Sequence, residues 1–532
     1  MQIFFICIIL VFKVILKILE FTGLYVPIVA LIIIVLIETK FNISVTYGSN
    51  ADHIEVILMC LSLIPVPFIL IGNIIRLVKV DFSFIECISA LRQRRYSVKD
   101  KTYENIDDEL IGLESGVILG KINRDYLVME EKSEGHIMVV GGQGSGKSSS
   151  IAIPTLLNYN SSIFAIDIKG ELSGSSKNYR WNMKVFDPLN EDTPHFNPYA
   201  VLKYGNKVQG AREIAHSIIP IGANEKDPYW KQSAQNLLTA CILHYENLGN
   251  DFPTTCKEIM KTPINELIER LSNSPVCEVK LFINPFIGAD TKLIASIYST
   301  LSNEIILFAT DKDIMRALSD TGSMISPRDL ESYTDIFIKI SEDKLEQWKS
   351  LLNLIVSQFL KSFEKREDKK NKKILFMIDE FARLGKVESI TNGLATLRSK
   401  GIQIMLILQS LAQLDMIYGQ DTRKVITDNC NYKIILNASD VDTQEYFSKL
   451  VGTVEKIKKS NSVNKNDFSI TSNKGASKTT EEKRIIKPEE FAYLEKPVVF
   501  TPKGFFRPNK VKWYEDKIFI ERAKEQNNRE IV

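Results

Sequence analysis

Apolar residues are distributed in three different ways along this 532-residue chain. Within the first 77 residues they form uncharged runs at 21–37 and 56–75, which predict spans at about 21–38 and 54–75, each about long enough to cross a hydrocarbon core of about 30 Å. From 205 to 307 they recur every three or four residues, which predicts a series of amphipathic helices. At 136–204 and 308–532, short apolar runs alternate with helical spacing, which predicts a mostly parallel, doubly wound α/β sheet.

These patterns divide the chain into four expected parts. Residues 1–77 are a membrane anchor, and 78–135 are a connector with the first short strands. An α/β domain follows, and its two halves enclose an inserted all-helical domain at 205–307. Residues 1–20 are apolar but place three charged side chains on one helical face, so they are either an interfacial helix or an additional span. Two buried core helices of a soluble protein are the alternative to the anchor.

Basic residues are unevenly divided between the two sides of the expected anchor. The loop between the two apolar runs has one, Lys40, whereas five follow the second run between Arg76 and Arg95. An excess of Lys and Arg marks the cytoplasmic side of membrane proteins. We therefore expect a multi-pass protein of the cell membrane, with residues 76–532 in the cytoplasm.

The composition narrows the possible chemistry. The formal net charge is +2, so a contact with nucleic acid would need a local basic patch or a pore lining. The seven cysteines and five histidines are scattered, which predicts neither a zinc site nor a disulfide framework. The charged turn at 365–373 is expected to be a solvated loop, with a DNA contact as the alternative.

A glycine-rich turn follows the first apolar strand of the α/β region, at 137–140. It has the spacing G-x-x-x-x-G-K-[ST] of a phosphate-binding loop and precedes a segment that can form a helix. Lys147 would reach the β- and γ-phosphates, and the Ser148 hydroxyl would take one position on Mg²⁺. A flexible Gly/Ser loop is the alternative. The sequence predicts that ATP and Mg²⁺ bind to a loop made of Gly141, Gly142, Gln143, Gly144, Ser145, Gly146, Lys147, Ser148 and Ser149.

Two carboxylates end a later apolar strand, at 373–378. Asp379 and Glu380 follow it directly, as a nucleotide site requires of the strand beside a phosphate-binding loop. Asp379 is predicted to hold Mg²⁺ through water, and Glu380 to orient or deprotonate the attacking water. The alternative is that the pair simply begins an ordinary helix.

Two further polar residues stand near these strands. Gln409 follows the apolar strand at 402–408 and could sense the γ-phosphate, although it could also be an ordinary loop residue. Arg398 lies near the end of a helix expected at 387–400. Residues 455–485 are rich in Lys, Ser, Asn and Thr, which indicates either a mobile loop or an exposed hairpin.

In order and context, these features resemble one family, the type IV secretion coupling proteins of the VirD4/TraG group. The resemblance covers nearly the whole chain and includes the N-terminal spans, the phosphate-binding loop and the helical insertion. Ile168 stands where the family usually has proline, a change that touches no ligand-binding group. The remaining matching motifs are Asp167-Ile-Lys-Gly-Glu171, Phe196-Asn-Pro198, Ile378-Asp-Glu-Phe-Ala-Arg-Leu-Gly385, Leu397-Arg-Ser-Lys-Gly401, Ile407-Leu-Gln-Ser410 and Ile486-Lys-Pro-Glu-Glu-Phe491.

The resemblance implies a RecA-like P-loop NTPase motor that assembles as a hexamer, with ATP at subunit interfaces. It implies that Gln409 is a sensor and that Arg398 is an arginine finger for the neighbouring subunit. For Arg398, a helix-end residue that satisfies carbonyl groups is the alternative.

The resemblance also implies a function. The expected protein is a membrane-anchored ATPase and DNA translocase that delivers a relaxase-bound DNA, single-stranded and bound without regard to sequence, to a type IV secretion channel during conjugation. Three alternatives stay open: a coupling ATPase for protein effectors, a chromosome-partitioning translocase, and a nucleotide-gated docking receptor without motor activity.

Overall fold

The computed structural model describes residues 108–203, 205–222, 225–368, 372–463 and 474–525. They belong to one compact unit, residues 105–532. The predicted spans at about 21–38 and 54–75 therefore lie outside the described residues, as do the basic residues that follow them.

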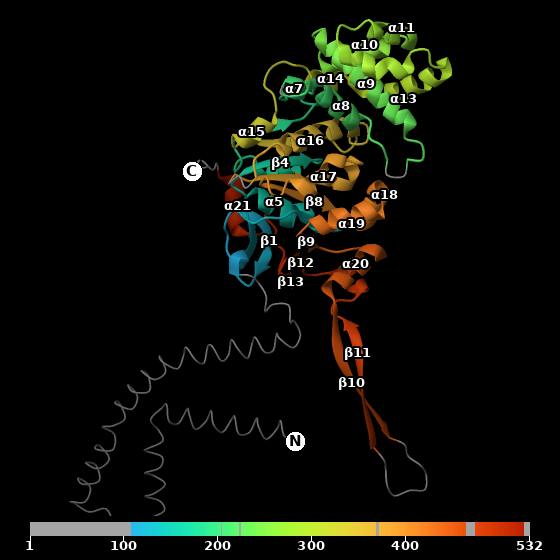
Figure 1. The fold of residues 1–532 in the computed structure, drawn as a ribbon. Helices are drawn as coiled ribbons and strands as arrows, with labels where there is room; N and C mark the ends of the chain where they lie inside the picture. The colour runs from blue at the N-terminus through green and yellow to red at the C-terminus, as the bar shows by residue number, and fades with distance from the viewer. Residues whose placement is uncertain (1–107, 204, 223–224, 369–371, 464–473, 526–532) are drawn as a thin grey trace, which may run out of the picture. The chain divides into compact units, whose positions relative to one another are not determined.

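A nine-stranded sheet is the framework of the described unit (Figure 1). Its strand order is β13-β12-β9-β3-β8-β7-β4-β6-β5. The strands from β9 to β5 run parallel, and β12 and β13 add an antiparallel edge. In sequence order they are β3 (Ile137–Val140), β4 (Ser162–Asp167), β5 (Met183–Phe186), β6 (Asp335–Lys339), β7 (Ile374–Ile378), β8 (Ile402–Leu408), β9 (Tyr432–Ile435), β12 (Val498–Thr501) and β13 (Gly504–Phe506).

The central strands are largely apolar because both faces of the sheet are covered. Successive residues of β3 enter different cores: Val139 joins one apolar cluster, and Val140 joins the other. The core that contains Val140 includes α16 (Lys349–Glu364) and α17 (Glu388–Thr396), and the core that contains Val139 includes α5 (Ile153–Leu156). Buried parallel strands therefore read as continuous apolar runs, which is why the sequence located them.

The remaining helices connect the strands or precede the antiparallel edge, except for the last, which follows it. They are α6 (Glu171–Ser176), α7 (Ala200–Lys203), α15 (Pro327–Glu331), α18 (Leu411–Tyr418), α19 (Gln420–Asn429), α20 (Val441–Val451) and α21 (Lys517–Lys524). Helix α18 was not anticipated from the sequence, and α17 ends before Arg398 rather than continuing to residue 400.

Between β5 and β6 the chain forms a group of helices with no described strand (Figure 1). Its members are α8 (Lys207–Ile218), α9 (Tyr229–Asn247), α10 (Phe252–Lys261), α11 (Ile264–Ser272), α12 (Cys277–Ile283), α13 (Thr291–Thr310) and α14 (Lys312–Ala317). The single helix expected at 254–271 is wrong: Pro263 separates α10 from α11, because proline disfavours a helical conformation in the residue before it. Helices α12 and α14 were not anticipated.

Helix α13 is the one described helix whose length and composition would let it cross a membrane. Its residues Ile297, Leu301 and Phe308 are buried, and the helix packs against α9 and α10. We therefore describe it as part of this helical group.

Two antiparallel pairs lie outside the large sheet. Strands β1 (Gly116–Ile122) and β2 (Asp125–Glu130) pair before β3, where the sequence predicts short strands. Strands β10 (Thr453–Val463) and β11 (Lys474–Arg484) form a long ribbon after α20. The second pair decides between the two alternatives for 455–485 in favour of a hairpin.

Candidate functional site

The glycine-rich loop predicted from the sequence joins β3 to the next helical turn. Gly144 and Gly146 have φ angles of 72° and 98°, a region that favours glycine. The Lys147 ammonium turns back and donates to the carbonyl oxygens of Gly141 and Gly142, at 2.7 and 3.2 Å. Burial lowers the pKa of Lys147. The Lys147 ammonium is thus bonded to carbonyl groups of its own loop, and phosphate oxygens could replace them as its partners.

The rest of the loop forms the start of a helix. Gln143 is exposed at the tip of the loop and Ser145 is buried beneath it. Ser148 begins a π turn, Ser148–Ala152, in which the Ile153 N–H donates to the Ser148 carbonyl five residues earlier. Such turns occur frequently at functional sites. The predicted Mg²⁺ ligand Ser148 therefore lies at the amino end of this turn, where N–H groups are free to meet an anion.

One contact of the loop was not anticipated from the sequence. The Gly142 N–H donates to Asn437 Oδ1 at 2.7 Å. Asn437 lies just beyond the end of β9, the strand that neighbours β3 on the side away from β8. Only the position of an asparagine directly after an apolar strand could have signalled it, and that signal is weak without the strand order.

The two predicted carboxylates follow β7 at the same edge of the sheet. Asp379 is buried, and burial, followed by the charge of Glu380, raises the pKa of its carboxyl to about 6. Such a group is costly to ionise in isolation but suits a divalent cation, which would offset the cost. We find no cluster of three His, Cys, Asp or Glu side chains among the described residues, so the remaining ligands of a cation would be a hydroxyl, water and phosphate oxygens.

Glu380 is held in an uncommon backbone conformation. Its φ and ψ are 49° and 45°, in the left-handed region, and a short 3₁₀ turn, Phe381–Leu384, follows it. A non-glycine residue there costs about 1–3 kcal/mol and persists only where its surroundings enforce it. The surroundings of Glu380 therefore hold its backbone in a conformation that is locally unfavourable.

Gln409 lies beside Glu380. Its side-chain Nε2 donates to Glu380 Oε2 at 3.0 Å. Gln409 follows β8, and β8 lies between β3 and β7 in the sheet. The strand order therefore brings the phosphate-binding loop, the glutamine and the two carboxylates to one edge, as expected where parallel strands end.

Arg398 lies elsewhere on the molecule. It occupies the turn before β8, and its Nε donates to Glu134 Oε2 at 3.3 Å in a half-exposed ion pair. Arg398 precedes β8 and Gln409 follows it, so the two residues flank the seven-residue strand, whose length is about 23 Å. Arg398 therefore does not belong to the same cluster as Lys147, Glu380 and Gln409 within one chain.

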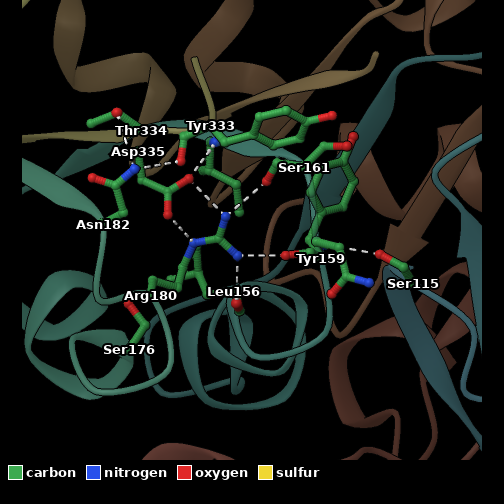
Figure 2. A network of polar contacts seen from close by, with 12 residues as sticks. Ser115, Leu156, Tyr159, Ser161, Ser176, Arg180, Asn182, Tyr333, Thr334 and Asp335 are labelled. Carbon is green, nitrogen blue, oxygen red and sulfur yellow. Dashed lines mark hydrogen bonds and ion pairs between the residues drawn. The ribbon is translucent and has the colours of Figure 1, made fainter. Parts of the chain in front are cut away.

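A buried ion pair supports the far end of the helix that follows the loop (Figure 2). Arg180 donates through Nε and Nη2 to the two carboxylate oxygens of Asp335, at 2.8 and 2.7 Å, and both side chains are fully buried. Its Nη1 also donates to the carbonyl oxygens of Leu156 and Tyr159, at 2.9 and 2.6 Å. Arg180 thus caps α5 and ties it to the start of β6.

The motif at 167–171 also has a structural part in this region. Asp167 accepts from the N–H groups of Leu172 and Ser173 and from the Ser173 hydroxyl, at 3.2, 2.8 and 2.6 Å. Gly170, with φ of 68°, lets the chain turn between β4 and α6. The carboxylate therefore fixes the start of a helix beside the site.

Comparison with known proteins identifies relatives of this chain. VirD4 of Rhizobium radiobacter is 27% identical over 335 residues, which are 60% of this chain and 48% of that protein. TraG, a conjugal transfer protein of Escherichia coli, is 25% identical over 359 residues, which are 61% of this chain and 56% of that protein. The chain thus spans about half the length of these curated relatives.

Solved structures of the bacterial conjugative coupling protein TrwB have the same fold. The unbound form superimposes with a TM-score of 0.60 at 17% identity, covering 75% of this chain and 88% of that one. TrwB bound to the non-hydrolysable ATP analogue ADPNP gives a TM-score of 0.59 at 18% identity, with 75% and 89% coverage. TrwB has also been solved with ADP and Mg²⁺.

A comparison with protein families matches a longer part of the chain than these single relatives do. The family described as type IV secretory system conjugative DNA transfer matches residues 86–531. This chain therefore belongs to the type IV secretion coupling proteins of conjugative DNA transfer.

Proposed function

We propose that this protein is a membrane-anchored ATPase that delivers relaxase-bound DNA to a type IV secretion channel. The family to which the chain belongs supports the conjugative part of this proposal. The ADPNP and the ADP–Mg²⁺ complexes of TrwB support ATP and Mg²⁺ as ligands of the phosphate-binding loop.

The contact between Gln409 and Glu380 is the observation that favours a motor. A receptor that used nucleotide only to set its shape would need the phosphate-binding loop and a metal ligand, but no carboxylate poised for water. Glu380 is held in a strained conformation and is bonded by a polar residue from the neighbouring strand end. A strained, oriented carboxylate is what activation of an attacking water requires.

The residues divide the chemistry as follows. Lys147 leaves the carbonyl groups of its own loop and binds the β- and γ-phosphates. Ser148 and Asp379 hold Mg²⁺, which when bound neutralises charge that develops on the phosphate oxygens. Glu380 accepts a proton from the attacking water, and Gln409 orients the carboxylate and registers the γ-phosphate.

Arg398 would complete the site of a neighbouring subunit. Its position at the other end of β8 makes a contact with the γ-phosphate of its own chain unfavourable. An exposed arginine that pairs with the exposed Glu134 can exchange that partner at little cost. We therefore propose a homo-oligomer, a hexamer by family resemblance, in which Arg398 stabilises transition-state charge in trans.

The remaining parts of the chain would serve transport. Residues 1–77 would anchor the protein in the cell membrane, with 76–532 in the cytoplasm. Residues 136–204 and 308–532 would form the RecA-like motor, and 205–307 would form the inserted helical domain that receives cargo. DNA would be gripped through its phosphates, without regard to sequence and with a strong dependence on salt. Export of protein effectors by the same engine is the second candidate.

ATP hydrolysis by the full chain in detergent or nanodiscs tests the proposal. It should be measured with and without single-stranded DNA, at low and raised salt. We expect stimulation by DNA that fades as salt rises, no hydrolysis in Lys147→Ala, and nucleotide binding without hydrolysis in Glu380→Gln.

The outcomes separate the candidates. Hydrolysis that ignores DNA would favour the export of proteins. Hydrolysis that survives in Glu380→Gln would contradict the catalytic role of that residue. Nucleotide binding with no hydrolysis by the wild-type protein under any of these conditions would favour the receptor.

A further inference from the structure

A segment near the end of the described chain, residues 507–525, runs along the helix that follows the phosphate-binding loop. We refer to this segment as the strap. In Figure 1 its helix, α21, lies beside α5 and β1. The strap begins directly after β13, the antiparallel edge strand on the β9 side of β3. It therefore approaches the loop from the side opposite to β8 and β7.

At the amino end of the helix, two hydrogen bonds join the strap to the loop. The Lys510 ammonium donates to the Ser145 carbonyl at 3.0 Å. The Trp513 N–H donates to the Ser149 carbonyl at 3.1 Å, a group that the π turn leaves without its α-helical partner. Residues 510–513 thus span the outer side of the loop from Ser145 to Ser149.

The far end of the strap is anchored independently. Arg522 Nη1 donates to the Leu157 carbonyl and to Asn158 Oδ1, at 3.0 and 2.6 Å. The fully buried Phe519 packs edge-on against Tyr126, whose hydroxyl donates to Asp516 at 2.7 Å. These contacts fix α21 against β2 and the end of α5, so the position of Lys510 is determined by the fold rather than by a free chain end.

The strand order also indicates on which side of the loop the nucleoside would lie. The γ-phosphate would lie toward β8 and β7, since Glu380 and Gln409 follow those strands. A polyphosphate seated on the loop with its γ-phosphate there would have its opposite end, the α-phosphate with the ribose and base, toward the β9 side. Lys510 and Trp513 reach the loop from that side, as Asn437 does after β9.

We propose that Lys510 binds the nucleoside end of the nucleotide, and that Lys510 and Trp513 form the wall against which the ribose and base lie. The inference rests on the proposed binding of ATP and adds a residue that is remote from the loop in sequence. The ammonium of Lys510 bonds to a neutral carbonyl, whereas that of Lys512, two residues later, pairs with the Glu515 carboxylate at 2.9 Å. Burial lowers the pKa of Lys510, and the charge of Lys512 adds to this effect.

A comparison of ATP with inorganic tripolyphosphate tests the proposal on the full-length protein. Tripolyphosphate occupies the phosphate positions of the loop but has neither ribose nor base. In Lys510→Met we expect ATP to bind about 10-fold more weakly, because a hydrogen bond from a charged group is lost. The affinity for tripolyphosphate should stay within about 2-fold of the wild-type value, and Lys510→Arg should recover most of the binding of ATP.

Lys512→Met is the matched control, since it removes a neighbouring cation that already has a carboxylate partner. It should leave the affinity for both ligands unchanged. A thermal melt of each variant verifies that the fold is retained.

Three outcomes would contradict the proposal while leaving ATP binding intact. These are unchanged affinity for ATP in Lys510→Met, equal weakening of ATP and tripolyphosphate, and a loss of ATP affinity of the same size in Lys512→Met. Failure of the wild-type protein to bind either ligand would instead contradict the proposed function.

Discussion

The side-chain amide of Gln409 donates a 3.0 Å hydrogen bond to Glu380 Oε2, and so joins the ends of two neighbouring parallel strands. Glu380 has a left-handed backbone conformation, which is unfavourable for a residue other than glycine, and Gln409 holds its carboxylate in place. The phosphate-binding loop follows β3, the strand on the other side of β8. Glutamine, carboxylate and loop therefore form one arrangement at one edge of the sheet.

Replacement of Gln409 should slow the chemical step with little effect on binding. In Gln409→Ala the carboxylate loses its orienting donor, and we expect kcat to fall by about 10- to 100-fold. Gln409→Glu should be at least as severe, because a second carboxylate would repel Glu380. Steady-state hydrolysis and calorimetric titration with ADP separate the two effects.

Gln420→Ala, at the exposed start of α19, is a suitable control for this experiment. An ADP affinity that fell in parallel with kcat would show that Gln409 supports the fold of the site rather than Glu380.

Arg398 should act between subunits. Arg398→Ala and Lys147→Ala are each expected to lack hydrolysis, the first because the finger is missing and the second because the phosphates are not held. A mixture of the two should regain part of the activity, since an intact loop on one subunit can meet an intact arginine on the next. Hydrolysis measured across mixing ratios tests this expectation.

Arg212→Ala, on α8, serves as the control and should remain active alone. If the mixture of Arg398→Ala and Lys147→Ala stayed inactive while assembling normally, a finger supplied in trans would be ruled out.

The ion pair between Arg180 and Asp335 should matter for stability. Arg180→Met leaves the Asp335 carboxylate buried without its guanidinium, and we expect a loss of about 3–5 kcal/mol in the free energy of unfolding. Chemical denaturation measures the change. Lys424→Met, which breaks the exposed pair with Asp421, should produce no measurable change. Equal effects of the two substitutions would contradict a special role for burial.

His136, directly before β3, should make the fold sensitive to acid. Its Nδ1 accepts from the Ile404 N–H at 3.1 Å, and burial lowers the pKa of the ring from 6.5 to about 4. The folded protein therefore binds a proton less readily than the unfolded chain. The contribution of the neutral His136 ring to the free energy of unfolding is complete above pH 6.5. It is lost progressively as the pH falls toward 4, by up to about 3 kcal/mol.

His136→Gln retains an acceptor for Ile404 but does not titrate. Its free energy of unfolding should fall less steeply than that of the wild type between pH 6.5 and 4. Parallel pH profiles of the two proteins would assign the acid sensitivity to other groups.

The sequence by itself determined the central strands and the residues that follow them. A parallel strand covered on both faces must be apolar along its length, and a polar residue at its end stands out. This is why 402–408 was predicted with the bounds that β8 has, and why Asp379, Glu380 and Gln409 could be named. The phosphate-binding loop could be predicted equally well, because its glycines and Lys147 lie within the segment 141–147.

The tertiary structure alone decided which of these residues meet. The contact between Gln409 and Glu380 depends on β8 lying beside β7, and the exclusion of Arg398 from the site of its own chain depends on the direction of β8. Lys510 and Ser145 are 365 positions apart, and no local pattern marks their contact. The spacing of apolar residues shows which face of a helix or strand is buried, because the same face is buried at every turn or at every second residue of that element. Strand order and the path of the strap arise from packing between distant segments, so no repeating pattern in the sequence predicts them.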